Sequence, residues 1–101
     1  MRFASDVTAL TTKDTGQKIT GRTRIQGIQY VHNSSADLTL SNGTTSTGTT
    51  LLQLTSHSAL GTEDVFIPDN GILFDSGMHL TNSNTAAITS ITVFYVGGGE
   101  T

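Results

Sequence analysis

The composition of this chain is dominated by residues that suit strands and turns rather than helices. Thr, Ser, Gly and Asn occupy 45 of the 101 positions, and Thr alone occupies 19. Thr is branched at Cβ and fits a pleated, half-buried surface, whereas Gly, Asn and Ser favour the turns that join strands. This composition predicts an all-β fold, and the length is that of one domain.

Short stretches with strand character follow one another at intervals of about 8–12 residues, as in sandwiches and barrels. In residues 36–41, Leu38 and Leu40 alternate with polar residues, as expected for a strand with one face on the core. Residues 68–71, Pro-Asp-Asn-Gly, give the strongest turn signal. We therefore predict a single antiparallel β-sandwich, jelly-roll or immunoglobulin-like, with seven to eight short strands.

The chain divides into three parts in this interpretation. Residues 1–18 form an N-terminal arm or an edge strand, residues 19–96 form the sandwich domain, and residues 97–101 form a flexible Gly-rich tail. Ile25 and Ile28 have opposite parity, so we expect Gly27 to mark a bulge that re-phases its strand, unless both faces are covered.

The expected core is mostly aliphatic. It comprises Ile25, Ile28, Leu38, Leu40, Leu52, Leu54, Val65, Ile67, Leu73, Leu80, Ile91 and Val93. Five aromatic residues within or at the ends of predicted strands are also interpreted as core rather than as stacking platforms: Tyr30, Phe66, Phe74, Phe94 and Tyr95.

Charge is segregated along the sequence. All five basic residues lie within the first 24 positions, whereas residues 25–101 contain six carboxylates and no Lys or Arg. A basic segment on an acidic body favours contact with an acidic partner or with the acidic body of a neighbouring copy. The alternative is that these charges only face solvent. The candidate partner-binding residues are Arg2, Lys13, Lys18, Arg22 and Arg24.

The acidic body also lacks the lysines that commonly protect exposed edge strands. Its edges must be short, bulged or covered by other chains, and coverage predicts a homo-oligomer, which we expect to be a trimer. The longest apolar runs fall short of the roughly 20 residues that cross a bilayer, so we expect no membrane insertion. The first residues resemble no secretory signal, which predicts synthesis and folding in the cytoplasm.

Motifs for catalysis and metal binding do not emerge from the sequence. The chain has no cysteine, which excludes disulfides, thiolate chemistry and zinc ribbons. The three histidines His32, His57 and His79 match no ligand spacing. Ser58 and His57 could form a triad with Asp64, but no nucleophile elbow surrounds any serine.

An oxygen-ligand cluster for calcium is conceivable, but turn formation explains the same residues. Its members are Asp64, Asp69, Asn70, Gly71 and Asp75. Nucleic-acid binding is not expected, because Phe3 is the only aromatic residue among the basic ones. We therefore expect neither an enzyme nor a cofactor.

Three segments carry a resemblance to a known group of proteins. Gly21–Ile28, Ser46–Leu52 and Ile67–Phe74, with the closing residues 93–95, resemble small β-sandwich virion proteins of tailed bacteriophages. The resemblance covers residues 19–96 and rests on turn and strand signatures without catalytic content. It implies a structural virion protein of the capsid decoration or cement type, which binds the major capsid protein or another virion protein.

Two other roles remain open. The same fold could serve as a tail or neck adaptor, or as a host-contacting spike or fibre component. A carbohydrate-binding module is the further alternative, although such modules usually expose Trp or Tyr, and this chain has no Trp and two Tyr.

Overall fold

The computed structural model describes residues 7–68 and 71–100. These residues form eight strands and one short 3₁₀ turn, without an α-helix, so the predicted all-β fold class is confirmed. The strands are β1 (Thr8–Thr12), β2 (Gly16–His32), β3 (Asp37–Asn42), β4 (Thr50–Thr55), β5 (Gly61–Phe66), β6 (Ile72–Phe74), β7 (Gly77–Asn82) and β8 (Ile88–Glu100), and the 3₁₀ turn η1 is Thr85–Ala87.

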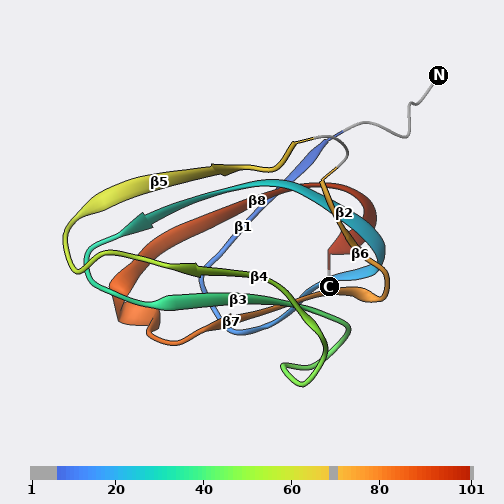
Figure 1. Cartoon of the computed structure of the whole chain (residues 1–101), viewed down its shortest axis with the longest axis horizontal. Helices are drawn as coiled ribbons and strands as arrows, with labels where there is room; N and C mark the ends of the chain where they lie inside the picture. Colours follow the sequence, from blue (N-terminus) through green and yellow to red (C-terminus); the bar gives the residue numbers. More distant parts are fainter. Residues whose placement is uncertain (1–6, 69–70, 101) are drawn as a thin grey trace.

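All strands belong to one antiparallel sheet that folds over on itself into two layers (Figure 1). The central strand is β2, which pairs with β8 along one edge and successively with β7, β6 and β5 along the other. The upper layer in Figure 1 contains β1, β8, the second half of β2, and β5. The lower layer contains the first half of β2, then β7, β3 and β4.

This pairing order distinguishes between the two predicted architectures. One layer has the order β1-β8-β2-β5 and the other has β2-β7-β3-β4. That is the strand order of a jelly roll, which has eight strands. Here two of those eight, consecutive in the sequence, are joined as the two halves of the long, bent β2. The short β6 lies beside β2 at the bend.

Three neighbouring segments of the chain pass from one layer to the other at the same place, which we call the corner. β2 bends at residues 21–22, β8 bends at residues 97–98, and the chain between β6 and β7 bends at residues 75–76. Gly21 has φ +80 and Gly98 has φ +65, backbone conformations that L side chains rarely adopt. A Cβ at Gly98 would also collide with the Thr23 hydroxyl, so the corner requires glycine there.

The last glycines of the chain differ from the expected flexible tail. The last glycines are part of β8, in which Gly97 pairs with Thr23, and Gly99 with Thr20. Consecutive glycines indicated flexibility in the sequence, but here they supply the positive φ values and the close approach that carry β8 around the corner. At the other end of the chain, Thr8–Thr12 form the edge strand β1, antiparallel to β8.

The predicted bulge in β2 is present. The register between β2 and β8 shifts between Ile25 and Gly27, and the Gln26 carbonyl accepts a hydrogen bond from the Ile67 amide at 3.0 Å. Because of the shift, Ile25 and Ile28 both face the core in spite of their opposite parity.

The core lies between the two layers. Of the expected aliphatic residues, seven are buried: Ile25, Ile28, Leu38, Leu40, Leu80, Ile91 and Val93. Leu52, Leu54, Val65 and Ile67 pack against this cluster while partly exposed, and Leu73 is also partly exposed. The core additionally contains Ile19, Ala36, Met78, Ala87 and Ile88, which the sequence interpretation did not include.

The aromatic residues divide into two groups. Tyr30, Phe74 and Tyr95 are buried as expected, but Phe66 is 84% exposed and Phe94 is 37% exposed. Their interpretation as core residues was wrong, because both occupy the outer face of the upper layer. No helix of the described chain is long and apolar enough to cross a membrane.

Candidate interaction surface

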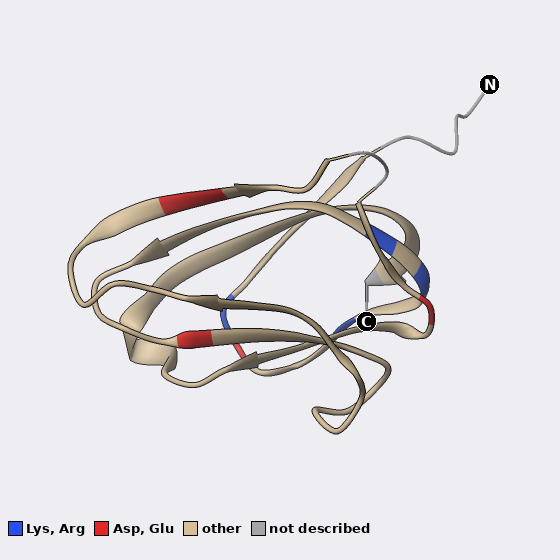
Figure 2. Cartoon of the chain, viewed as in Figure 1, with Lys and Arg blue, Asp and Glu red and all other residues tan. Residues whose placement is uncertain are grey.

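Of the five predicted partner-binding residues, the four that the structure describes are not brought into one patch (Figure 2). Lys13 is exposed in the turn between β1 and β2, and Lys18 is half-buried in the first half of β2. Arg22 and Arg24 lie together at the corner. Arg2 lies outside the described residues. The bend of β2 separates residues that are close in sequence, so the linear basic segment does not become a single basic face.

The two corner arginines border a hollow of about 330 Å³. Thr23, Val96 and Gly97 complete its lining. Neither arginine has an ion pair with a carboxylate of residues 7–68 or 71–99. Asp75 is exposed and follows β6 at the same corner. The corner therefore offers two guanidinium groups to an outside acceptor.

A second, more apolar hollow lies beside it on the outer face of the upper layer. Phe94 on β8, Gly27 on β2 and Phe66 on β5 are direct neighbours across three strands. Because Gly27 has no side chain, a space of about 320 Å³ remains between the two rings. Val7 borders this space, and the polar residues at its rim are Gln26 and Asp64. We call this space the aromatic hollow.

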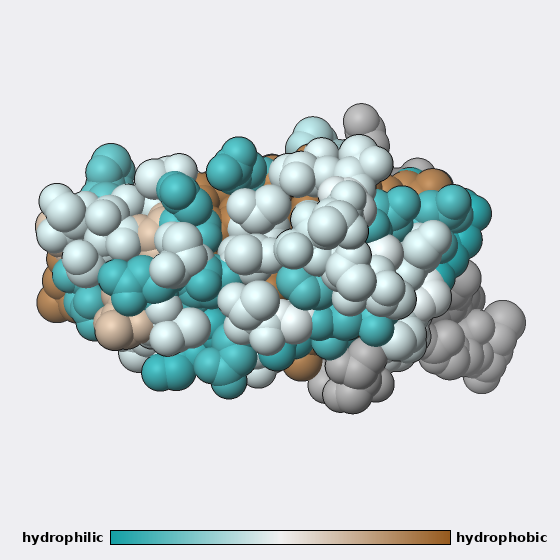
Figure 3. All heavy atoms as spheres, turned by 90° about the horizontal axis from the view of Figure 1, so that it is seen from below, coloured by the Kyte–Doolittle hydropathy of each residue, from teal (hydrophilic) through white to brown (hydrophobic). Residues whose placement is uncertain are grey.

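Phe94 and Val96, which line the two hollows, are two residues apart on β8 and so face the same side of the sheet. Six exposed or half-buried residues of the two linings form what we call the outer-face surface: Val7, Arg22, Arg24, Phe66, Phe94 and Val96. Seen from below, the molecule is mostly hydrophilic or neutral (Figure 3). The outer-face surface thus combines exposed aromatic groups with unpaired positive charge.

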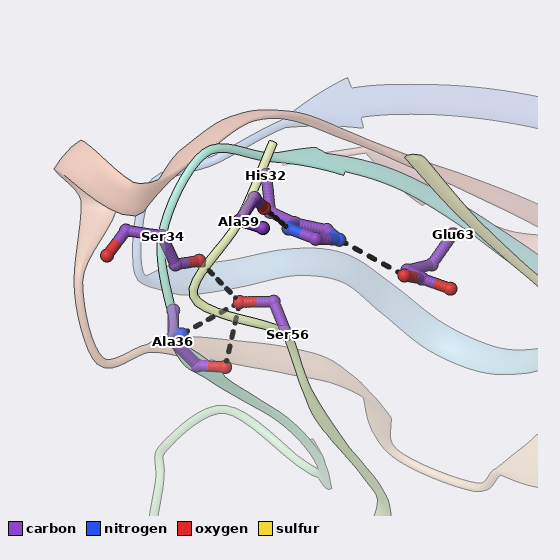
Figure 4. Close-up of polar contacts among 6 residues, drawn as sticks. All are labelled: His32, Ser34, Ala36, Ser56, Ala59 and Glu63. Carbon is purple, nitrogen blue, oxygen red and sulfur yellow. Dashed lines mark hydrogen bonds and ion pairs between the residues drawn. The ribbon is translucent and has the colours of Figure 1, made fainter. Parts of the chain in front are cut away.

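Polar contacts tie together the loops at the end of the molecule opposite the corner (Figure 4). The hydroxyl of Ser56 accepts from the Ala36 amide at 2.8 Å and donates to the Ser34 carbonyl at 2.9 Å. The Ser56 amide donates to the Ala36 carbonyl at 2.9 Å. These bonds hold the loop after β4 against the loop after β2.

His32 extends this network to β5. Its Nδ1 lies 2.7 Å from the Ala59 carbonyl oxygen, and its Nε2 lies 3.1 Å from Oε2 of Glu63. Both partners are acceptors, so the neutral ring can donate one of these bonds and the protonated ring donates both. Burial raises the pKa of the nearby Tyr30 phenol, and the negative charge of Glu63 raises it further. The arrangement fixes the loop of residues 56–60 rather than presenting a reactive group.

The residues considered for chemistry are not assembled into a site. His57 and Ser58 are exposed on the loop, and Asp64 is exposed on β5. The rings of His32 and His57 have centroids 6.3 Å apart, whereas His79 is buried on β7. The conceivable calcium cluster falls partly outside the description, because it includes Asp69 and Asn70. Within the described residues, no group of three or more His, Asp or Glu could hold a metal ion.

Comparison with protein-family models, curated proteins and solved structures gave no match. We therefore infer function from the surfaces themselves. The alternation of side chains along a strand could have revealed the outer-face surface. Val65 and Ile67 are assigned to the core, so Phe66 between them must face outward. Phe94 lies between Val93 and Tyr95 in the same way. Large exposed apolar groups that gather on one face mark an interaction site.

Proposed function

We propose that the protein is a structural subunit of a tailed-bacteriophage virion, of the capsid decoration or cement type, and that its outer-face surface docks on the capsid lattice. The observation that carries this proposal is the clustering of Phe66, Phe94 and Val7 beside Arg22 and Arg24, which have no ion pair within the described part of the chain. This combination suits a partner surface that is both apolar and acidic.

The energetics of such docking favour a protein that acts in many copies. Covering one exposed Phe side chain contributes about 1.5–3 kcal/mol. Exposed arginines add charge-assisted contacts and faster association, and their effect is screened over about 8 Å at physiological ionic strength. Each subunit bound to the assembled shell, but not to dissociated capsid protein, shifts the equilibrium toward the shell by mass action.

Two further features support the proposal. Jelly rolls are frequent in viral capsid domains, an analogy at the level of fold alone. Within the described chain, β1, β4 and β5 each pair along one edge only. None of these edge strands carries a lysine. Edges of this kind are protected when neighbouring subunits cover them.

The test is mass spectrometry of purified particles from the phage that encodes this chain, with quantification of copies per particle. We expect the chain in the particle at a copy number comparable to that of the major capsid protein. A copy number that is a small multiple of three would instead place it on the tail or neck. Absence from purified particles would refute a structural role.

The docking surface is tested by particle occupancy across a salt series. The Arg22→Ala, Arg24→Ala double variant should occupy fewer sites than the wild type, and its occupancy should depend less on salt. Lys13→Ala is the control, because Lys13 is exposed in the turn between β1 and β2 and borders neither hollow. Equal occupancy of the double variant and the control would show that the corner does not dock.

The sequence predicts residues 1–18 as the N-terminal arm, but the structure requires a shorter truncation. Removal of this whole arm would delete β1, whose Leu10 packs against the core. A chain that starts at Val7 leaves the described strands intact. We therefore compare occupancy of the full chain with that of residues 7–101, which isolates the contribution of Arg2 and Phe3.

A carbohydrate-binding role is the second candidate, supported by the aromatic hollow. Two exposed rings flank it, and Gln26 and Asp64 provide polar groups at its rim, as sugar recognition requires. Binding to a glycan array that Phe66→Ala abolishes would favour this role. Particle incorporation without any glycan binding would exclude it as the main function.

A further inference from the structure

One large apolar side chain stands apart from the outer-face surface. Among the described residues, the large exposed hydrophobic side chains are Val7, Leu60, Phe66 and Phe94. All but Leu60 border the aromatic hollow. Leu60 is 80% exposed at the end of the loop 56–60, just before β5 begins. The molecule therefore has the aromatic hollow on one face and the exposed Leu60 side chain, which we call the knob, at the far end of β5.

The knob is held in place on both sides. The carbonyl of Ala59, the residue before Leu60, is hydrogen-bonded to His32 at 2.7 Å. The residue after it, Gly61, is already paired with His32 in the β2–β5 ladder. Ser56 anchors the start of the same loop. Because its backbone is fixed, Leu60 would lose little conformational entropy on docking.

The knob cannot reach the hollow of its own chain. Leu60 directly precedes β5 and Phe66 is its last residue, so the two are six positions apart, or about 20 Å at the usual rise per residue. A rigid strand keeps them at that distance. Contact between the two features is thus possible only between different copies.

The charges around the two features are complementary. Arg22 and Arg24 border the corner hollow, whose Val96 is two residues from Phe94 of the aromatic hollow on β8, and neither has a carboxylate partner in residues 7–68 and 71–99. The knob is followed by Glu63 and then by Asp64. Oε2 of Glu63 lies 3.1 Å from His32 Nε2, and the Glu63 side chain is still 39% exposed. Figure 2 shows these carboxylates on β5, away from the basic corner. Asp64 also lines the hollow, so the arginine side is where an incoming carboxylate is accommodated.

We propose that the aromatic hollow receives Leu60 of a second copy of this chain, with Glu63 of that copy directed to the corner arginines. Such a contact joins two different surface patches. It closes either as a reciprocal dimer, in which each knob enters the hollow of the other copy, or head to tail as a ring of three or more subunits. The contact is independent of the virion role, because it follows from the surfaces of the chain alone.

The first test is the mass of single-site variants by sedimentation over a concentration series. The wild type should have a whole multiple of the mass of the chain, two for a reciprocal dimer and three or more for a ring. Leu60→Asp removes the knob. Phe66→Asp removes one aromatic wall of the hollow and adds a negative charge, and both variants should be monomers. Both side chains are so exposed that the fold should tolerate either change. Gln53→Asp, an exposed site on β4, is the control and should keep the mass of the wild type.

The second test mixes the two monomeric variants. Leu60→Asp retains an intact hollow, and Phe66→Asp retains an intact knob. A head-to-tail contact predicts that an equimolar mixture forms one-to-one dimers that cannot grow further. An association of hollow against hollow predicts no such dimer, because one of the two hollows is always defective.

Several results would overturn the proposal. They are a monomeric wild type at every concentration, oligomers formed by Leu60→Asp, or a mixture that remains monomeric. The other occupant of the hollow to be tested is the N-terminal segment of the same chain. If residues 7–101 associate while the full chain is monomeric, residues 1–6 fill the hollow in place of a second copy.

Discussion

The three phenylalanines of the upper layer and corner provide a strict test of the fold, because the same substitution should have very different effects. Phe74 on β6 is fully buried, with 0% of its surface exposed, and belongs to the core cluster. Phe66 is 84% exposed on the outer face. The sequence alone assigns both to the core.

The expected magnitudes follow from these exposures. Phe74→Ala removes a buried ring and leaves a cavity, which lowers the free energy of unfolding by about 3–5 kcal/mol. For a domain of this size, that loss lowers the melting temperature by roughly 12 °C or more. Phe66→Ala removes a ring that mainly contacts water, so the free energy of unfolding should change by less than about 0.5 kcal/mol. The loss in the free energy of unfolding for Phe94→Ala should lie between these two values.

The assay is urea unfolding followed by far-UV circular dichroism, since the chain has no Trp for fluorescence. All variants carry Leu60→Asp as a common background, so that changes in association do not contribute to apparent stability. Equal losses for Phe66→Ala and Phe74→Ala would refute the assignment of Phe66 to the outer face. A loss below about 1 kcal/mol for Phe74→Ala would refute its burial at the corner.

Three further predictions address the turns, the loop network and pH. Gly71→Ala should lower the free energy of unfolding by more than about 2 kcal/mol, because φ is +80 and the added Cβ would collide with a carbonyl of β2. In Gly43→Ala the added Cβ has no atom within 4 Å, so the loss should be limited to the backbone strain of about 1–2 kcal/mol. Ser56→Ala should cost about 1–3 kcal/mol in urea unfolding, because it leaves buried backbone groups unpaired, whereas the exposed Ser58→Ala should have no effect. The folded-state pKa of Tyr30 is raised above its ordinary value of 10.0, so its contribution to stability should be complete below that pH and be lost as pH rises through the folded-state pKa. In alkaline titrations Tyr30→Phe should therefore lose less stability than the wild type, and equal losses would contradict the assignment.

Local patterns predicted most of the strands and part of the core. Leu38 and Leu40 alternate with polar residues, and both are buried as that alternation requires. At the predicted turn, the described flanking residues are hydrogen-bonded, with the Gly71 amide donating to the Pro68 carbonyl at 3.2 Å. These features depend on neighbours in the sequence, and local propensity is informative there.

The corner could not be predicted in the same way. It arises where residues 21–22, 75–76 and 97–98 meet, although they are distant in the sequence. Gly98 is close to the side chain of Thr23, and only the pairing of β2 with β8 makes that contact visible. For the same reason the basic residues at positions 13–24 were expected to form one surface, whereas the bend of β2 places Lys18 in one layer and Arg24 in the other.

The core and the aromatic hollow have a common origin in the bulge of β2. Without the register shift at Gln26, Ile25 and Ile28 would face opposite sides of the sheet, and one of them would be lost from the core. The shift buries both isoleucines and places Gly27 directly between Phe94 and Phe66. A Cβ at Gly27 would lie 3.7 Å from the Phe94 ring and 3.2 Å from the Val65 carbonyl oxygen, within the floor of the hollow. A chain with the same bulge and a larger residue at this position would keep both isoleucines in the core but fill the space that we assign to Leu60 of a second copy.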